Sequence, residues 1–172
     1  MTRRRGRSGG RREPVPVGPP RVLLTGMSGT GKTTVVRALR RFDIRAIDMD
    51  EPGWSYHDEH GHQRWLVERL EAAMDAAADE ALVVAGCAED QAALRPRFTH
   101  VVLLSAPAER IEVRIAERSD HPFGKDPAEL ARVMADLREV EPRIRRTATL
   151  EVVTTVPIAV VVERVRAHCG LA

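Results

Sequence analysis

The stretch Gly-Met-Ser-Gly-Thr-Gly-Lys-Thr at residues 26–33 decides the fold of this 172-residue chain. It follows the P-loop pattern G-x-x-x-x-G-K-[ST], in which backbone N–H groups and one lysine surround phosphate groups. A short apolar run at residues 22–24 precedes it, and a helix-like stretch at residues 34–39 follows it. Strand, glycine-rich turn and helix form the context in which this pattern binds a nucleoside triphosphate. We therefore predict nucleotide binding at this loop.

Each residue of the loop has a predicted role. The glycines let the backbone turn tightly enough for successive N–H groups to face the phosphates. Lys32 is expected to reach the β- and γ-phosphates, and the Thr33 hydroxyl to coordinate Mg²⁺. The start of the following helix adds partial positive charge. The residues predicted to contact the nucleotide here are Gly26, Met27, Ser28, Gly29, Thr30, Gly31, Lys32, Thr33 and Thr34.

Length and composition bound the class of protein. A chain of 172 residues is enough for one α/β domain with an adequate core. No apolar run approaches the ~20 residues of a membrane span, and the N-terminus lacks the apolar segment of a secretion signal. Cys87 and Cys169, the only cysteines, offer neither a disulfide framework nor a metal-ligand spacing. We expect a cytoplasmic protein without membrane partners.

Residues 1–20 differ in composition from the rest of the chain. They hold six arginines against one acid, Glu13, among Gly, Pro, Ser and Val. Such a segment buries too little apolar area to offset its ordering entropy, so we predict a disordered tail. The tail could contact nucleic acid or be a solvated leader, and we favour the leader. The remainder of the chain is net negative, which makes nucleic acid an unlikely partner of the domain.

From residue 21 onward, β-rich and helical patterns alternate. Strands are expected at residues 21–24, 45–47, 81–85, 100–104 and 150–153, and helices at 32–41, 63–80, 88–94, 107–118, 128–147 and after 157. This alternation predicts one α/β domain at residues 21–172, with a five-stranded parallel sheet covered by helices on both faces in three layers, as in P-loop NTPases. Ligands then bind beyond the carboxyl ends of the strands.

Two acids leave the second expected strand together. Asp48 and Asp50 alternate along an extended segment, so both carboxylates can point toward the same side. We place them at a strand end next to the P-loop strand. One could hold Mg²⁺, and the other could orient or deprotonate an acceptor hydroxyl in a phosphoryl transfer.

These features together resemble the group of small P-loop kinases that includes shikimate kinase, gluconate kinase and adenylate kinase. The resemblance rests on residues 26–34, on the Asp48-x-Asp50 pair and on a charged break after the fourth strand, and it covers essentially all of residues 21–172. It implies ATP and Mg²⁺ as cofactors. It also implies that Asp48 lies near the metal with Thr33 and that Asp50 holds the acceptor hydroxyl.

The same resemblance implies a mobile lid around residues 118–128. In this group the lid bears two basic residues seven apart, one near adenine and one on the transferred phosphate. Arg118 and Lys125 have that spacing, and Pro122 and Gly124 suit a segment that opens and closes. Lys125 and Lys32 are the only lysines among 27 Lys and Arg residues, which agrees with a requirement for a compact ammonium at both positions. We predict Lys32, Asp50, Arg118 and Lys125 as catalytic residues, with Arg118 also contacting the nucleotide.

The chain departs from two of the named members, shikimate kinase and adenylate kinase. It reads Gly86-Cys87-Ala88 where shikimate kinase has three glycines, and Val140 where that enzyme has an arginine two residues before Pro142. The Asp-Gly-aromatic-Pro-Arg signature of adenylate kinase is missing. The acceptor therefore stays open, with a loose set of pocket candidates: Trp54, Tyr56, Arg64, Cys87, Glu89, Asp90, Gln91, Arg95, Arg97, Arg143, Arg145 and Arg146.

The leading prediction is an ATP-dependent kinase that phosphorylates a hydroxyl of a small metabolite. A nucleoside or nucleotide kinase is the nearest rival, and it would need Arg64, Arg95 or Arg97 in its pocket. Two further hypotheses are an ATP-binding accessory protein with slow ATPase activity and a kinase of nucleic-acid 5′-hydroxyls. His57, His60 and His62 match no known metal-ligand spacing, and we expect them on an exposed loop.

Overall fold

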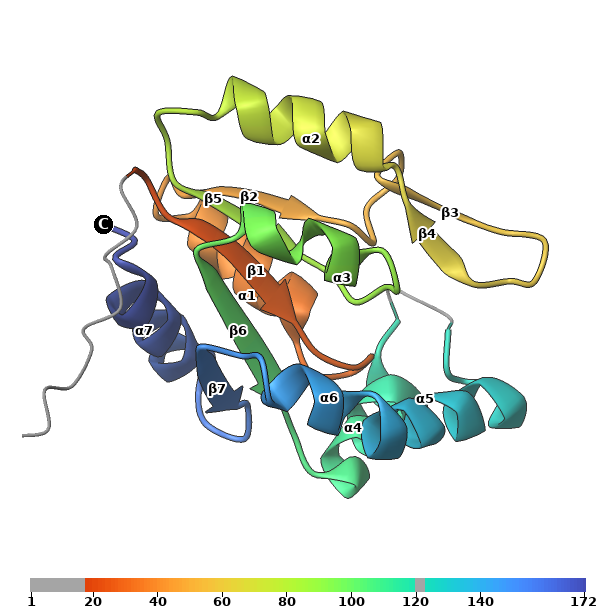
Figure 1. Ribbon diagram of the computed structural model, residues 1–172. Coiled ribbons are helices and arrows are strands. Elements are labelled where there is room, and N and C mark those ends of the chain that lie inside the picture. The colour runs from red at the N-terminus through yellow and green to blue at the C-terminus, as the bar shows by residue number, and fades with distance from the viewer. Residues whose placement is uncertain (1–17, 120–122) are drawn as a thin grey trace, which may run out of the picture.

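The computed structural model describes residues 18–119 and 123–172. Nearly all of the predicted tail (1–20) and positions 120–122 of the predicted lid lie outside the described residues. Five parallel strands form the central sheet in the order β2-β5-β1-β6-β7 (Figure 1). Their bounds are β1 Arg21–Thr25, β2 Arg45–Asp48, β5 Leu82–Ala85, β6 His100–Ser105 and β7 Leu150–Val153. The predicted five-stranded parallel sheet is confirmed.

Helices cover both faces of this sheet (Figure 1). One face packs on α1 (Lys32–Arg40) and α7 (Ile158–Cys169), and the other on α2 (Val67–Ala76) and α3 (Gln91–Leu94). The 3₁₀ turn η1 (Arg95–Arg97) follows α3 directly. The short helix α6 (Glu141–Arg145) packs on the second face through Ile144 and Leu103. Beyond the carboxyl ends of the strands, α4 (Ala108–Glu117) packs on α5 (Pro127–Glu139) in an apolar cluster of its own. The predicted three layers are therefore present.

The central strand β1 is buried on both faces. Val22 and Leu24 face the α1–α7 side, and Leu23 faces the α2–α3 side, each at most 2% exposed. This explains the unbroken apolar run in the sequence, because a strand covered on both faces has no polar side to show. Leu24 lies opposite Ala85 of β5 and Val102 of β6, so the P-loop starts between these two strands.

One prediction was wrong at residues 55–66. The expected helix 63–80 begins only at Val67, because β3 (Ser55–His57) and β4 (Gln63–Trp65) pair as an antiparallel hairpin, the β3–β4 hairpin. Asp58 closes its turn by accepting hydrogen bonds from the backbone N–H groups of His60 and His62. The apolar spacing continued from α2 into β4, and helical periodicity alone cannot detect a pairing partner eight residues upstream.

The expected helix 128–147 is also divided. It ends at Glu139, and α6 starts at Glu141 with Pro142 in its first turn, where a missing N–H costs nothing. A continuous helix through Pro142 would lose one backbone hydrogen bond and bring the proline ring against the preceding turn. The start of α5 is set by Asp126, whose side chain accepts a hydrogen bond from Ala128 N.

Leu24→Ala tests whether β1 carries the core. Leu24 is 0% exposed, so we expect the free energy of unfolding to fall by about 2–5 kcal/mol, from lost burial and the cavity left behind. Urea denaturation followed by circular dichroism measures this change. Val153→Ala is the control, because Val153 is 44% exposed on the edge strand β7. A similar loss in both variants would contradict the central role of β1.

Candidate functional site

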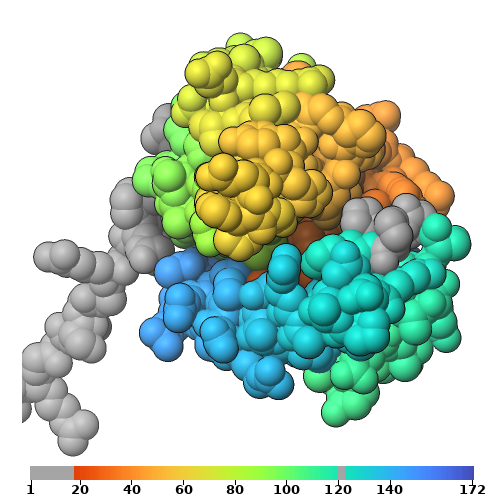
Figure 2. Space-filling model, turned by 90° about the vertical axis from the view of Figure 1, so that its right-hand side faces the viewer, coloured from red at the N-terminus to blue at the C-terminus, as the bar shows by residue number. Residues whose placement is uncertain are grey.

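A cavity of about 2000 Å³ lies at the carboxyl edge of the sheet. Residues of the P-loop line it, together with the β3–β4 hairpin and α3 on one side and α5 and α6 on the other. In Figure 2 the segments of residues 50–80 and of α5–α6 stand apart with a hollow between them. The cavity extends well past the P-loop, so it offers room for a second molecule beside a nucleotide.

The P-loop has the close-packed geometry that its sequence predicts. Gly26 has φ 148°, and a Cβ there would overlap the carbonyl oxygen of Leu104 on β6, so only glycine fits. The Thr30 hydroxyl donates to Met27 O at 2.7 Å. Lys32 Nζ donates to Gly26 O at 2.7 Å and to Met27 O at 3.2 Å, and this side chain is buried. The ammonium is therefore held over the loop rather than extended into solvent.

Asp48 ends β2 with its carboxylate buried in the cavity wall. It is 1% exposed; Oδ1 accepts a hydrogen bond from Asp50 N at 3.1 Å, and Oδ2 is buried without a partner among the described residues. Burial raises the pKa of Asp48, and hydrogen bonding from Thr33 opposes the rise. An unsatisfied anionic oxygen close to the Thr33 hydroxyl suits a hard cation such as Mg²⁺. The residues predicted to hold the metal thus fit it.

The described residues contain no larger metal cluster. No group of three or more His, Cys, Asp or Glu side chains among residues 18–119 and 123–172 could hold a metal ion.

Asp50 lies on the turn after β2 and lines the same cavity as the P-loop. Its Oδ1 accepts a hydrogen bond from Gln63 Nε2 of the β3–β4 hairpin at 2.8 Å. Contrary to the prediction, β2 does not neighbour β1, because β5 lies between them. The two aspartates nevertheless share the cavity with Lys32, since all of these strands end at the same edge of the sheet.

The two predicted lid cations occupy different positions. Arg118 follows α4, lines the cavity and donates to the carbonyl oxygen of Phe123. Gly124 has φ 90°, and a Cβ there would lie 2.9 Å from Ile115, so this turn also requires glycine. Lys125 is exposed and is not among the cavity-lining residues. Its predicted contact with a transferred phosphate would need movement of this segment and stays a prediction.

The sequence analysis did not predict Arg114, which connects the P-loop to the residue that follows the edge strand β7. Its Nη1 donates to Gly29 O at 3.2 Å and to Thr154 Oγ1 at 2.8 Å. Burial lowers the pKa of this guanidinium. Arg114 lies on α4, four residues before the C-cap residue Arg118, and this helical spacing of two basic residues could have revealed it.

The acceptor candidates divide into two groups. Those that line the cavity are Cys87, Glu89, Gln91, Arg95 and Arg143. Those that do not line the cavity are Trp54, Tyr56, Arg64, Asp90, Arg97, Arg145 and Arg146. Among these, Arg64 pairs with Asp58 and Glu89 at 3.0 and 2.8 Å. Arg97 pairs with Asp75 of α2 at 2.7 Å, so neither guanidinium faces the cavity.

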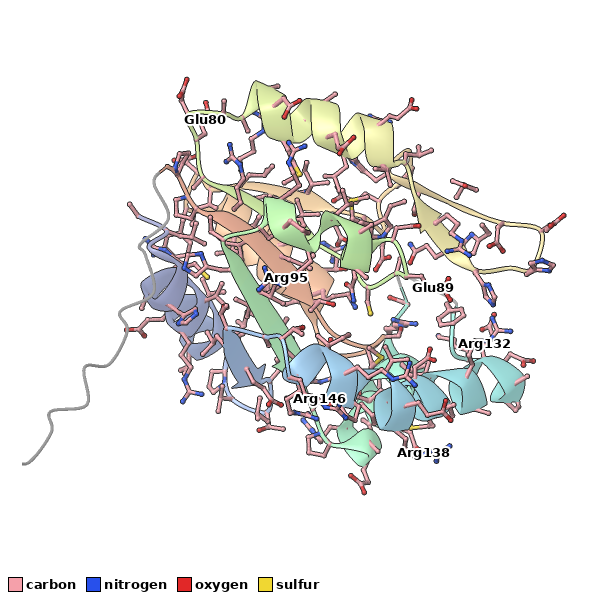
Figure 3. The ribbon with its side chains drawn as sticks, viewed as in Figure 1. Glu80, Glu89, Arg95, Arg132, Arg138 and Arg146 are labelled. Atoms are coloured by element: carbon pink, nitrogen blue, oxygen red, sulfur yellow. The ribbon has the colours of Figure 1, made fainter. Side chains whose placement is uncertain are left out.

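Further residues of the cavity wall had not been predicted as pocket residues. Ser55, His57, His62 and Gln63 come from the hairpin, and Arg132 and Asp136 come from α5. Burial raises the pKa of Asp136, and the charge of Arg132 opposes the rise. Arg132 and Glu89 come from opposite walls, and Figure 3 shows where each side chain lies. The spacing of Arg132 and Asp136, one helical turn, is the signal that could have identified this face of α5.

The sequence profile of a family described as an AAA domain matches residues 22–135. The chain belongs to this AAA-domain family. The match spans the P-loop, both aspartates, the hairpin and most of α5, so the family covers well over half of the chain. No curated protein matches the chain in sequence. None of the AAA-domain helices described here is long and apolar enough to cross a membrane.

Solved structures similar to this AAA-domain protein include several small kinases. A sugar kinase from Janibacter sp. is 22% identical with a TM-score of 0.61, covering 90% of this chain and 96% of its own. Shikimate kinase from Bacteroides thetaiotaomicron is 21% identical with a TM-score of 0.60, covering 88% and 99%. A gluconokinase from Sinorhizobium meliloti is 23% identical with a TM-score of 0.58, covering 88% and 92%. The predicted resemblance to the small P-loop kinases is confirmed at the level of the fold.

Asp48→Asn tests whether the buried carboxylate opposes folding. The folded chain holds the Asp48 proton more tightly than the unfolded chain, since its pKa is raised. Ionisation therefore destabilises the fold as pH rises through the interval between the two pKa values, and the cost is full above it. We expect Asp48→Asn to raise the Tm at pH 7, by an amount that shrinks as pH falls through that interval.

Differential scanning calorimetry across pH 4 to 8 provides the measurement. Asp79→Asn is the control, because Asp79 is exposed and its replacement should leave the Tm nearly unchanged. A lower Tm for Asp48→Asn at pH 7 would show that the carboxylate stabilises the wall instead.

Proposed function

We propose that this protein is an ATP-dependent kinase that transfers the γ-phosphoryl group of ATP to a hydroxyl of a small metabolite. The observation that carries the proposal is that one cavity is lined by the P-loop and also by Asp50, with space beyond both. A P-loop alone serves many NTPases, but a carboxylate facing an open second compartment suits an acceptor hydroxyl. The names of the similar structures, a sugar kinase, a shikimate kinase and a gluconokinase, agree with it.

We assign each residue a role that agrees with its position. N–H groups of the P-loop would bind the phosphates, and Lys32 would exchange its carbonyl partners for phosphate oxygens. The acceptor oxygen attacks the γ-phosphorus, the bond to the β-phosphate oxygen breaks, ADP leaves, and Asp50 receives the hydroxyl proton. Arg118, and Lys125 after closure of the lid segment, would stabilise the charge that develops on the transferred group.

Thr33 and Asp48 would hold Mg²⁺ beside the phosphates. The metal supplies neutralisation of phosphate charge when it is bound. We expect the nucleoside base to bind on the side of the P-loop away from Asp50, where Thr154, Val156 and Ile158 line the cavity. Arg114 connects this side to the P-loop, because it donates hydrogen bonds to both Gly29 O and Thr154 Oγ1.

The helical wall suggests which acceptors to test first. Arg132 and Arg143 line the cavity from α5 and α6, and neither has an ion pair among the described residues. Glu129 and Asp136 of α5 line the same wall, so it offers both guanidinium and carboxylate groups. Such a wall suits an acceptor that has a negatively charged group together with hydroxyl groups. A nucleotide kinase stays the second candidate, because Arg95 also lines the cavity. It is less supported, since Arg64 and Arg97 are held in ion pairs elsewhere.

An ADP-release screen tests the proposed reaction. We expect one class among sugars, sugar acids, shikimate-like acids, nucleosides and nucleoside monophosphates to stimulate ADP release. Lys32→Ala should lower this turnover by at least about 100-fold, because phosphate contacts of the transition state are lost. Asp50→Asn should remove acceptor-dependent turnover while ATP binding, measured by calorimetry, is retained.

Two outcomes would contradict this proposal. If no acceptor stimulates ADP release but slow ATP hydrolysis is present, the protein is an accessory ATPase. If the only acceptors are nucleic-acid 5′-hydroxyls and deletion of residues 1–17 abolishes the activity, the basic tail and nucleic acid define the function.

Arg132→Ala tests the acceptor wall separately. We expect the KM for the acceptor found in the screen to rise about 10-fold or more, with the KM for ATP unchanged. Arg138→Ala is the matched control, because Arg138 is also an exposed arginine of α5 but does not line the cavity (Figure 3). Equal effects of both substitutions would indicate a general loss of positive charge rather than a contact with the acceptor.

A further inference from the structure

We propose that Gln63 is a positioning residue that fixes the orientation of the Asp50 carboxylate toward the acceptor, an inference that rests on the proposed function. Gln63 lies on β4, thirteen residues after Asp50, and both side chains line the cavity. Its Nε2 donates to Asp50 Oδ1 at 2.8 Å and to Ser55 Oγ at 3.0 Å. No contact between these segments was predicted from the sequence.

The donor and the acceptor can be assigned for each hydrogen bond that joins Met49, Ser55, Gln63 and Asp50. The Ser55 hydroxyl donates its only proton to Met49 O at 2.7 Å, so toward Gln63 its oxygen can only accept. An ionised Asp50 carboxylate also only accepts. Both partners of the Gln63 amide are therefore acceptors, which requires the NH₂ group, and not the carbonyl oxygen, to face them. Its two protons are then both used, so the amide cannot turn without breaking a bond.

This arrangement leaves the other oxygen of Asp50 available for chemistry. Within residues 18–119 and 123–172, no hydrogen bond to Asp50 Oδ2 is present. Holding Oδ1 fixes the plane of the carboxylate, and Oδ2 is then the oxygen that can accept the proton of an acceptor hydroxyl. Without the Gln63 contact, an exposed aspartate would sample several rotamers, and a proton acceptor displaced by about 1 Å loses much of its effect.

The hairpin that carries Gln63 is itself held in place. Trp65 N, two residues along β4, donates to Asp90 Oδ2 at 2.9 Å, and the Trp65 ring is buried in the core. On the other face of the hairpin, Arg64 bridges Asp58 and Glu89 at 3.0 and 2.8 Å. The Gln63 amide is therefore presented from a strand that is fastened to the segment after β5, as a support for a reacting group needs to be.

Substitutions in the hairpin test this role with the acceptor found in the ADP-release screen. Gln63→Ala should lower kcat about 10- to 100-fold, with the KM for ATP unchanged. Gln63→Glu keeps the shape but removes the donor and adds a like charge beside Asp50, so its loss should be at least as large. Ser55→Ala removes the second anchor of the amide together with the bond to Met49 O but leaves the bond from Gln63 to Asp50, so its loss should be smaller. Tyr56→Ala is the control, since Tyr56 is 52% exposed on the opposite face of β3 and does not line the cavity.

A crystal structure of Gln63→Ala with Mg²⁺ and a non-hydrolysable ATP analogue gives a readout that needs no acceptor. We expect the Asp50 carboxylate to change rotamer or lose order, while the wild-type protein and Tyr56→Ala keep it in one orientation. An unchanged Asp50 side chain in Gln63→Ala would overturn the inference, whatever the activity. If Asp50→Asn abolishes turnover but Gln63→Ala keeps a normal kcat, the inference would also be overturned. If Asp50→Asn leaves turnover intact, the role of Asp50 in the proposed function fails, and the crystal structure still decides whether Gln63 orients it.

Discussion

The burial of β1 between two other strands and two helical layers is the constraint on which the site depends. Its side chains pack on both faces, and its backbone pairs with β5 and β6. The chain leaves β1 at the carboxyl edge of the sheet. There Gly26 passes against the Leu104 carbonyl with no room for a side chain. The P-loop is placed by the core of the protein, and every other functional group has to reach it from a neighbouring strand end or helix.

Two acidic side chains are buried to a similar extent but differ in their ion pairs. Glu141 and Asp48 are both at most 5% exposed, and burial raises the pKa of each. Arg145 pairs with Glu141 at 2.6 Å and also bridges to Glu151, so this acid is compensated inside the protein. Among the described residues each acid has one buried oxygen without a partner, Glu141 Oε2 and Asp48 Oδ2, but Asp48 has no ion pair of this kind. A buried carboxylate without an ion pair destabilises a fold, which is the pattern expected where a site serves binding rather than stability.

Much of the sheet could be predicted from local sequence. The strands and flanking helices of residues 21–47 and 81–118 lie close to their predicted bounds, because apolar runs and helical spacing are properties of short segments. The hairpin at residues 55–65 could not be predicted in this way. Its two strands are short and polar, and they are stable only because Trp65 packs into the core and Asp58 closes the turn.

The candidate site divides along the same line. The sequence by itself determined the P-loop, its lysine and the pair of acids at the end of β2, because these functions need particular residues at a fixed local spacing. Only the tertiary structure decided which arginines face the cavity, that β5 separates β2 from β1, and that Gln63 meets Asp50. The physical reason is that a side chain's partner depends on strand order and helix rotation, which are set by packing between segments far apart in the chain.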